Sequence, residues 1–122
     1  MSISMAEALK GHFISDVPIA HQHNLEDLLK RVNVLREAWG KPMVVTSGYR
    51  TAEDQRRINP KVTNSAHMVG MALDIADSDG LLYAWLVDNT KLLEEQGLWV
   101  EVRQGGWAHI QSRPTHNRFF KP

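Results

Sequence analysis

The stretch MALDIAD, residues 71–77, constrains the fold more than any other part of this sequence. Its largely apolar run predicts a buried strand in which Leu73 and Ile75 share one face and Asp74 points to the other. A carboxylate inside such a strand costs several kcal/mol unless it is paired, hydrogen-bonded or coordinated. We therefore expect that Asp74 either faces solvent or meets a group that compensates its charge.

Length and composition fit a single domain spanning residues 1–122, with one core and no repeat or linker. The 14 basic and 14 acidic side chains cancel, so charge provides no argument for a nucleic-acid or anionic-membrane partner. The absence of cysteine leaves only histidine, carboxylate and water for a metal site. Without a signal-like start or an apolar run near about 18 residues, we expect cytoplasmic synthesis and no membrane span.

The first half of the chain predicts one long helix after a less regular start. Residues 1–23 are predicted to form a loosely structured lead-in with one short helical turn. A helix is predicted from Asn24, as its cap, to Trp39, with Gly40 and Pro42 ending it. Its apolar stripe at helical spacing consists of Leu25, Leu28, Leu29, Val32, Leu35 and Trp39.

The remaining elements predict an α+β domain. Strands are expected at 43–46 and 71–77, and a second helix from Ser78 or Asp79 to Gly97. The segments LWVEVR and WAHIQ flank Gln-Gly-Gly, which is typical of a hairpin. Because strands and helices do not alternate regularly, we expect a small, mainly antiparallel sheet with packed helices.

Two histidines occupy settings comparable to that of Asp74. His67 lies just before the strand at 71–77, and His109 lies inside WAHIQ between apolar neighbours. Taken singly, such histidines are more often surface or hydrogen-bonded residues than ligands. Together, two neutral imidazoles and one carboxylate match a catalytic zinc site with its fourth position left to water.

The joint pattern resembles a known family. The string Ser65-x-His67-x-x-Gly70-x-Ala72-x-Asp74, followed by Trp107-x-His109, resembles the zinc D-Ala-D-Ala carboxypeptidases and related peptidoglycan endopeptidases. The segment SGYR at 47–50 is similar to the segment ahead of the first histidine in that family. The resemblance covers roughly residues 25–112. It implies the fold shared by these DD-peptidases and hedgehog signalling domains, with a zinc cofactor held by His67, Asp74 and His109.

The resemblance also implies roles for nearby residues. Arg50 corresponds to an arginine that grips a substrate carboxylate or carbonyl, which suits the bidentate guanidinium fork. Without the resemblance, an ion pair of Arg50 with Glu53 or Asp54 would be preferred. Gly70 would permit a tight turn. Ser65 is a candidate substrate-binding residue, although its hydroxyl equally suits a turn.

The pattern departs from the family at the general base. Relatives place a glutamate three residues, or a histidine five residues, before the last histidine, and here these positions are Gly106 and Gln104. A three-residue loop at 104–106 would set Glu101 opposite His109 on the same face, which predicts Glu101 as the replacement.

A two-residue turn at Gly105-Gly106 would instead pair Val102 with His109 and turn Glu101 to the other face. The apolar side chains of Val100 and Val102 favour the three-residue loop, because they would then line the core.

The resemblance implies a zinc metallopeptidase that hydrolyses amide bonds in peptidoglycan stem peptides or D-Ala-D-Ala ends. Glu101 and Arg50 would be catalytic, with Arg50 also binding substrate. We expect a monomer that acts at the cell wall after release, as a phage or prophage endolysin-like enzyme would. The alternatives are a non-catalytic zinc-containing wall-binding or virion module and a domain without metal.

Overall fold

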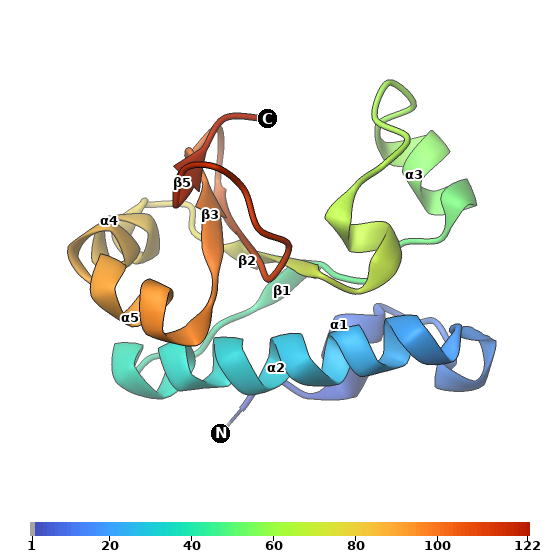
Figure 1. Cartoon of the computed structure of the whole chain (residues 1–122), viewed down its shortest axis with the longest axis horizontal. Helices are drawn as coiled ribbons and strands as arrows, with labels where there is room; N and C mark the ends of the chain where they lie inside the picture. Colours follow the sequence, from blue (N-terminus) through green and yellow to red (C-terminus); the bar gives the residue numbers. More distant parts are fainter. Residues whose placement is uncertain (1) are drawn as a thin grey trace.

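Five strands form one sheet in the order β1-β2-β4-β3-β5 in the computed structural model, which describes residues 2–122 (Figure 1). All neighbouring strands run antiparallel except β3 and β5, which are parallel. The strands are β1 Val45–Ser47, β2 Ala72–Ala76, β3 Trp99–Glu101, β4 Trp107–Gln111 and β5 Phe119–Phe120. The predicted α+β class with a small, mainly antiparallel sheet is confirmed.

Helices cover one face and one end of this sheet, whereas α3 stands apart at the opposite end (Figure 1). The longest helix, α2, lies along the sheet and supplies much of the core, with Leu25, Leu28 and Leu35 fully buried beside Leu73 and Ile75 of β2. The helical segments are α1 Met5–Leu9, η1 Ile14–Asp16, α2 Ile19–Trp39, α3 Ala52–Ile58, η2 Ala66–Val69, α4 Leu81–Asp88 and α5 Thr90–Gln96. None of the helices in the described part of the chain combines the length and apolar character that a bilayer span requires.

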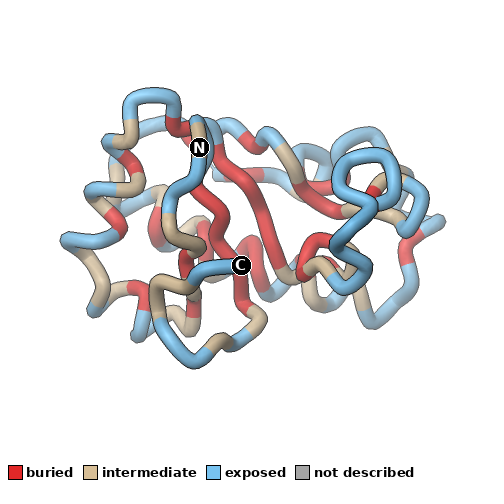
Figure 2. Tube along the Cα trace, turned by 90° about the horizontal axis from the view of Figure 1, so that it is seen from above, coloured by how far each residue is buried: buried red, intermediate tan, exposed pale blue. Residues whose placement is uncertain are grey.

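Buried positions follow the central strands and the inner sides of the helices, as Figure 2 shows. The end of α3 and the loop after it are different, because residues 56–64 are all exposed. One face of the sheet packs against the hydrophobic core. The other face carries polar side chains.

The predicted start of the long helix was wrong. Helix α2 begins at Ile19, after Pro18, whose carbonyl accepts the N–H of Gln22 at 3.0 Å. Asn24 lies inside the helix, and its side-chain amide donates to the carbonyl of Val69 at 2.8 Å. The first turns contain few apolar residues, so the stripe used for the prediction begins later than the helix. The predicted end at Gly40 is confirmed by its left-handed conformation, with φ of 73°.

The lead-in at 1–23 is also more ordered than predicted over residues 2–23, which are the part of it that the structure describes. Ile3, Leu9 and Val17 are buried in the core. Ser4 and Glu7 form a reciprocal capping box that starts α1. The segment is therefore an integral layer of the domain, which sequence periodicity misses because α1 has only five residues.

Three further elements differ from their predicted bounds. Helix α3 was not predicted, and β1 starts two residues later than expected. The single helix expected up to Gly97 is two helices, α4 and α5, which meet at Asn89. Asp79, one of the two predicted starting residues, accepts the backbone N–H of Leu81 at 3.0 Å, and Asp77 accepts those of Leu82 and Tyr83 at 2.9 and 3.0 Å.

Asp54 ties α3 to the segment after α1. Its carboxylate lies 2.6 Å from His12 Nε2 and 3.0 Å from Arg57 Nη2, and it forms a capping box with Thr51. Burial alone would raise the pKa of Asp54, but hydrogen bonds from the Thr51 N–H, His12 and Arg57 outweigh this and lower it to about 2. The charged form of Asp54 is thus favoured by folding.

Because this pKa is lowered by folding, Asp54 stabilises the fold above about pH 4 and loses this contribution as the pH falls toward about 2. We expect Asp54→Asn to reduce the free energy of unfolding by on the order of 1 kcal/mol near neutral pH, after allowing for solvent screening. Urea unfolding at several pH values should show this difference shrinking below about pH 4. Glu53→Gln, at an exposed position of the same helix, is the control, and a difference independent of pH would contradict this role.

Candidate active site

A row of polar side chains crosses the open face of the sheet. Ser47 of β1 pairs with Asp74 of β2, and Asp74 pairs with His109 of β4. On the other side of β4, the pair Val100–Ile110 has the register expected for a three-residue hairpin loop. Continuing this register by one residue sets Glu101 opposite His109, and paired residues point to the same face of a sheet.

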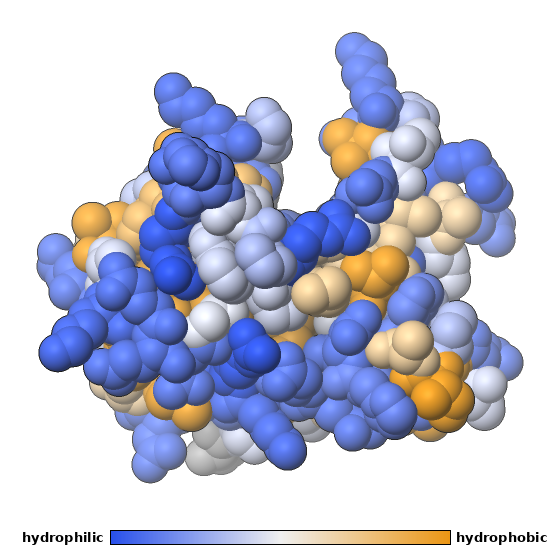
Figure 3. Space-filling view, in the orientation of Figure 1, coloured by the Kyte–Doolittle hydropathy of each residue, from blue (hydrophilic) through white to orange (hydrophobic). Residues whose placement is uncertain are grey.

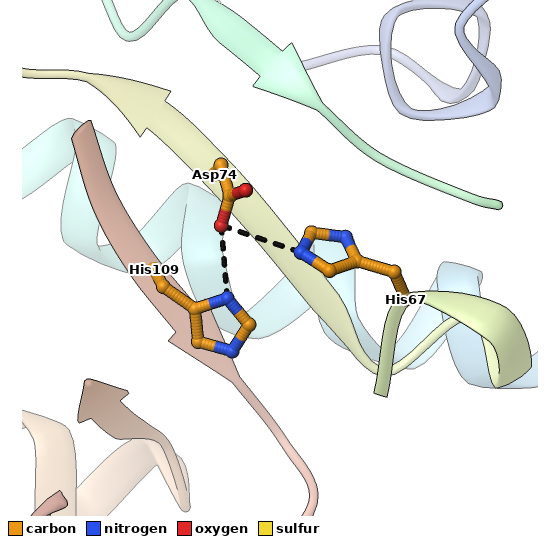
Figure 4. Close-up of side chains that lie close together, drawn as sticks. All are labelled: His67, Asp74 and His109. Atoms are coloured by element: carbon orange, nitrogen blue, oxygen red, sulfur yellow. Dashed lines mark hydrogen bonds and ion pairs between the residues drawn. The ribbon is translucent and has the colours of Figure 1, made fainter. Parts of the chain in front are cut away.

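Asp74 lies at the centre of a cluster with two histidines (Figure 4). Its Oδ1 atom lies 2.8 Å from His109 Nδ1 and 3.3 Å from His67 Nε2. One donor atom from each of the three residues falls within 4.8 Å of the others. The structure therefore brings together the three residues that the sequence predicted as metal ligands.

His67 is oriented by the backbone of a neighbouring segment. Its Nδ1–H donates to the carbonyl of Gly48 at 2.8 Å, which leaves the Nε2 lone pair facing Asp74. The side chain is 2% exposed, and Nε2 is buried without a hydrogen-bond partner. Burial lowers the pKa of His67 despite the nearby charge of Asp74, so the neutral imidazole that a metal ligand requires is favoured.

His109 is oriented by Gln111 on the same strand. The side-chain amide of Gln111 donates to the carbonyl of Arg113 at 2.8 Å, so its oxygen faces His109 Nε2 at 2.7 Å and accepts from it. This arrangement leaves Nδ1 toward Asp74. Burial alone would lower the pKa of His109, but the hydrogen bond and charge of Asp74 outweigh it and raise the pKa.

Asp74 remains ionised in this cluster. Burial opposes its charge, but the hydrogen bond from His109 and the nearby His67 imidazole hold the pKa of Asp74 well below its usual range. A carboxylate, a buried imidazole nitrogen without a partner and a second oriented imidazole form a donor set that fits zinc. The unpartnered Nε2 of His67 is the observation that favours a bound cation over a cluster satisfied internally.

Arg50 lies beside this cluster and not in the surface ion pair considered from sequence. Its guanidinium lies 3.6 Å from Asp74 Oδ2 and donates to Ser47 Oγ and Gln55 Oε1. The partner of Asp54 is Arg57 instead. Burial is the largest influence on Arg50 and lowers its pKa, whereas the charge of Asp74 acts in the opposite direction.

The turn that carries His67 is built by Ser65 and Gly70. The hydroxyl of Ser65 accepts the backbone N–H of His67 at 3.2 Å, which is the turn role left open by the sequence. Gly70 ends η2 with φ of 77°, as predicted for a tight turn. A Cβ atom at Gly70 would also lie 2.6 Å from the carbonyl oxygen of His21, so close packing against α2 requires glycine here.

Glu101 is half-buried at the edge of the cluster. Burial and the charge of Asp74 raise the pKa of Glu101, although His109 acts in the opposite direction. A carboxylate with a raised pKa next to a candidate metal centre is suited to proton transfer.

The comparisons with known proteins now identify the family. A family model described as Peptidase M15 matches residues 3–111. The chain belongs to the peptidase M15 family. No match was found among curated proteins or among solved structures. Because the matched region starts at residue 3, the family resemblance extends well beyond the range 25–112 expected from the motifs and includes α1.

Family membership supports a metallopeptidase with a peptide substrate, and peptidases of this family are zinc-dependent. The His67–Asp74–His109 cluster is a group that can hold such an ion.

Sequence reasoning missed two groups that orient the histidines. Gln111 stands two residues after His109, so strand periodicity alone would have placed both on the same face. The carbonyl of Gly48 carries no comparable signal, because a backbone contact across 19 residues depends on the fold.

We expect His67→Ala and Asp74→Ala to abolish stoichiometric zinc binding, because each removes a donor from a site with only three protein ligands. Metal analysis of purified protein and titration against a chromophoric chelator measure the occupancy. His23→Ala, an exposed histidine on α2, is the matched control and should bind zinc like the wild type. Full occupancy in the His67→Ala protein would contradict the ligand assignment.

Proposed function

We propose that this chain is a zinc-dependent peptidase that hydrolyses amide bonds in the stem peptides of bacterial peptidoglycan. The observation that carries the proposal is the buried, unpartnered Nε2 of His67, which faces Asp74 and His109 in a protein of a zinc-dependent peptidase family. His67 Nε2, an Asp74 carboxylate oxygen and His109 Nδ1 would hold the ion. When bound, zinc supplies a Lewis acid that polarises an amide carbonyl and lowers the pKa of water.

Glu101 is proposed as the proton-transfer group. The pairing of Val100 with Ile110, continued by one residue, supports a position of Glu101 opposite His109. Its raised pKa brings it closer to the range in which one carboxyl can both accept and return a proton. It would take a proton from the attacking water and deliver it to the leaving amine. This replaces the base that relatives carry at the positions of Gly106 and Gln104.

Arg50 is proposed to orient the substrate and stabilise negative charge on the carbonyl oxygen. Ser47 and Gln55 anchor its guanidinium beside Asp74, so its position is set before the substrate binds. A preorganised donor of this kind stabilises charge that develops in the transition state more effectively than water does. We also propose that Ser65 contacts the substrate, while its hydroxyl keeps the turn contact with the His67 N–H.

The substrate class follows from the family resemblance of the motifs. A peptide with D-amino acids, either within the stem or at a D-Ala-D-Ala end, suits an enzyme of this type. We propose that the protein acts on the wall after release, as a phage or prophage lysis enzyme would. It would act as a monomer.

A second function is favoured by one specific observation. Neither Gly106 nor Gln104 can act as the base found in relatives, so the domain could retain zinc and bind the wall without cleaving it. Such a module would keep the metal for stability.

Replacing Glu101 by Gln separates the two functions. We expect this change to reduce release of peptide ends from purified peptidoglycan by about 10²- to 10⁴-fold while leaving zinc content unchanged, because it removes only the proton-transfer group. Glu95→Gln, at an exposed position of α5, is the matched control.

Equal rates for wild type and the Glu101→Gln protein would exclude Glu101 as the base. Absence of release by the wild type from several wall chemotypes, together with co-sedimentation with insoluble peptidoglycan, would favour the binding module.

A further inference from the structure

Residues 113–122 follow the part of the chain that matches the family, and they are firmly attached to the sheet. Two backbone bonds join this C-terminal segment to β3, from Val100 N–H to the carbonyl of Arg118 at 2.9 Å and from Val102 N–H to that of Phe120 at 2.7 Å. The guanidinium of Arg118 lies 4.4 Å from the ring centre of Trp99. These contacts fix the segment as the outer strand beside β3.

The C-terminal segment reaches the candidate active site through Phe120. Phe120 pairs with Glu101 across β3 and β5, and its ring centre lies 6.0 Å from that of His109 in an edge-on arrangement. The row that begins at Ser47 therefore continues through Asp74, His109 and Glu101 to Phe120. Residues outside the family match thus contact both a candidate ligand and the proposed base.

The same segment lines a cavity of about 400 Å³ with a distinct chemistry. Val102, Phe119 and Phe120 provide apolar surface, and Lys121, which lines the cavity together with His116, provides a positive charge. None of the described residues that line this cavity is acidic. Its charge therefore complements an anionic group carried on an otherwise apolar segment of a ligand.

The length of the row matches a short peptide. Four inter-strand spacings separate β1 from β5, which corresponds to about 19 Å, or roughly five to six residues of extended chain. Arg50 lies at the β1 end and Lys121 follows Phe120 at the β5 end. Figure 3 shows that the molecule is hollowed between the lobe of α3 and its following loop and the lobe that carries the C-terminal segment.

We propose that residues 115–121 form a substrate subsite that selects a carboxylate of the peptide, with Lys121 as its specificity-determining residue and Phe120 as its wall toward the reaction centre. The peptide would lie across the strands, with one end near Arg50 and an acidic residue at the cavity beside β5. This proposal rests on the proposed peptidase function, because it concerns the binding of that peptide substrate.

The test uses two synthetic pentapeptides of stem type that differ at one group. One carries a γ-linked D-glutamate with a free α-carboxylate, and the other carries the corresponding α-carboxamide. Dissociation constants are measured on zinc-loaded Glu101→Gln protein, so that binding is determined without turnover, and KM and kcat are measured on protein with Glu101 intact. Lys121→Met is compared with Lys30→Met, an exposed lysine on α2, which covers the other face of the sheet.

We expect Lys121→Met to weaken binding of the carboxylate peptide by about three- to fivefold and to leave the carboxamide peptide unchanged, as for loss of one exposed ion pair. In turnover, KM for the carboxylate peptide should rise while kcat stays constant. Phe120→Ala should weaken binding of both peptides, because it removes apolar contact shared by both.

The proposal would be overturned if Lys121→Met left the preference for the carboxylate peptide intact, or if neither peptide bound to the zinc-loaded Glu101→Gln protein that carries Lys121. Failure of the proposed peptidase function would give a different result. The wild type would not cleave either peptide, but the difference in dissociation constant between the two peptides would still be measurable. Unchanged zinc content in Lys121→Met confirms that a change in binding comes from the subsite.

Discussion

The buried charge of Asp74 is the constraint on which the rest of this site depends. A carboxylate on a central strand is compatible with folding only if its charge is matched, and here two imidazoles and a guanidinium converge on it from three other segments. The hydrogen bond from His109 and the nearby imidazole of His67 keep Asp74 ionised in spite of burial. The buried carboxylate of Asp74 is costly for folding, but together with His67 and His109 it forms a compact donor set for a divalent cation.

Hydrogen bonds from groups around the cluster fix the orientation of its two histidines. The Gly48 carbonyl directs Nε2 of His67 inward, and Gln111 directs Nδ1 of His109 toward the same point. Gly48 is itself packed so closely that a Cβ atom there would lie 2.1 Å from the carbonyl oxygen of Ala8. Helix α1 thus helps to position a candidate ligand, and it lies within the part of the chain that matches the family.

The proposed proton-transfer group depends on strand register. A one-residue shift of the hairpin would turn Glu101 to the core face, and the observed pairing of Val100 with Ile110 prevents it. Val100 is fully buried, so the hydrophobic effect holds the register that places Glu101 at the site. A carboxylate on β3 is therefore held on the same face of the sheet as the candidate ligand His109.

The sequence by itself determined the fold class, the strand that carries Asp74, the hairpin and the three candidate ligands, because alternation, turn residues and motif spacing are local signals. It did not reveal the true start of α2, the packed α1, or the division of the last helical region into α4 and α5, since short or polar helices lack a periodic stripe.

Only the tertiary structure decided which side chains meet. The pairing of Arg50 with Asp74, the orientation of His109 by Gln111 and the approach of Phe120 to the site depend on strand order and on contacts between segments far apart in the chain. Local preferences cannot encode such contacts, because they form only when the whole sheet has closed around its core.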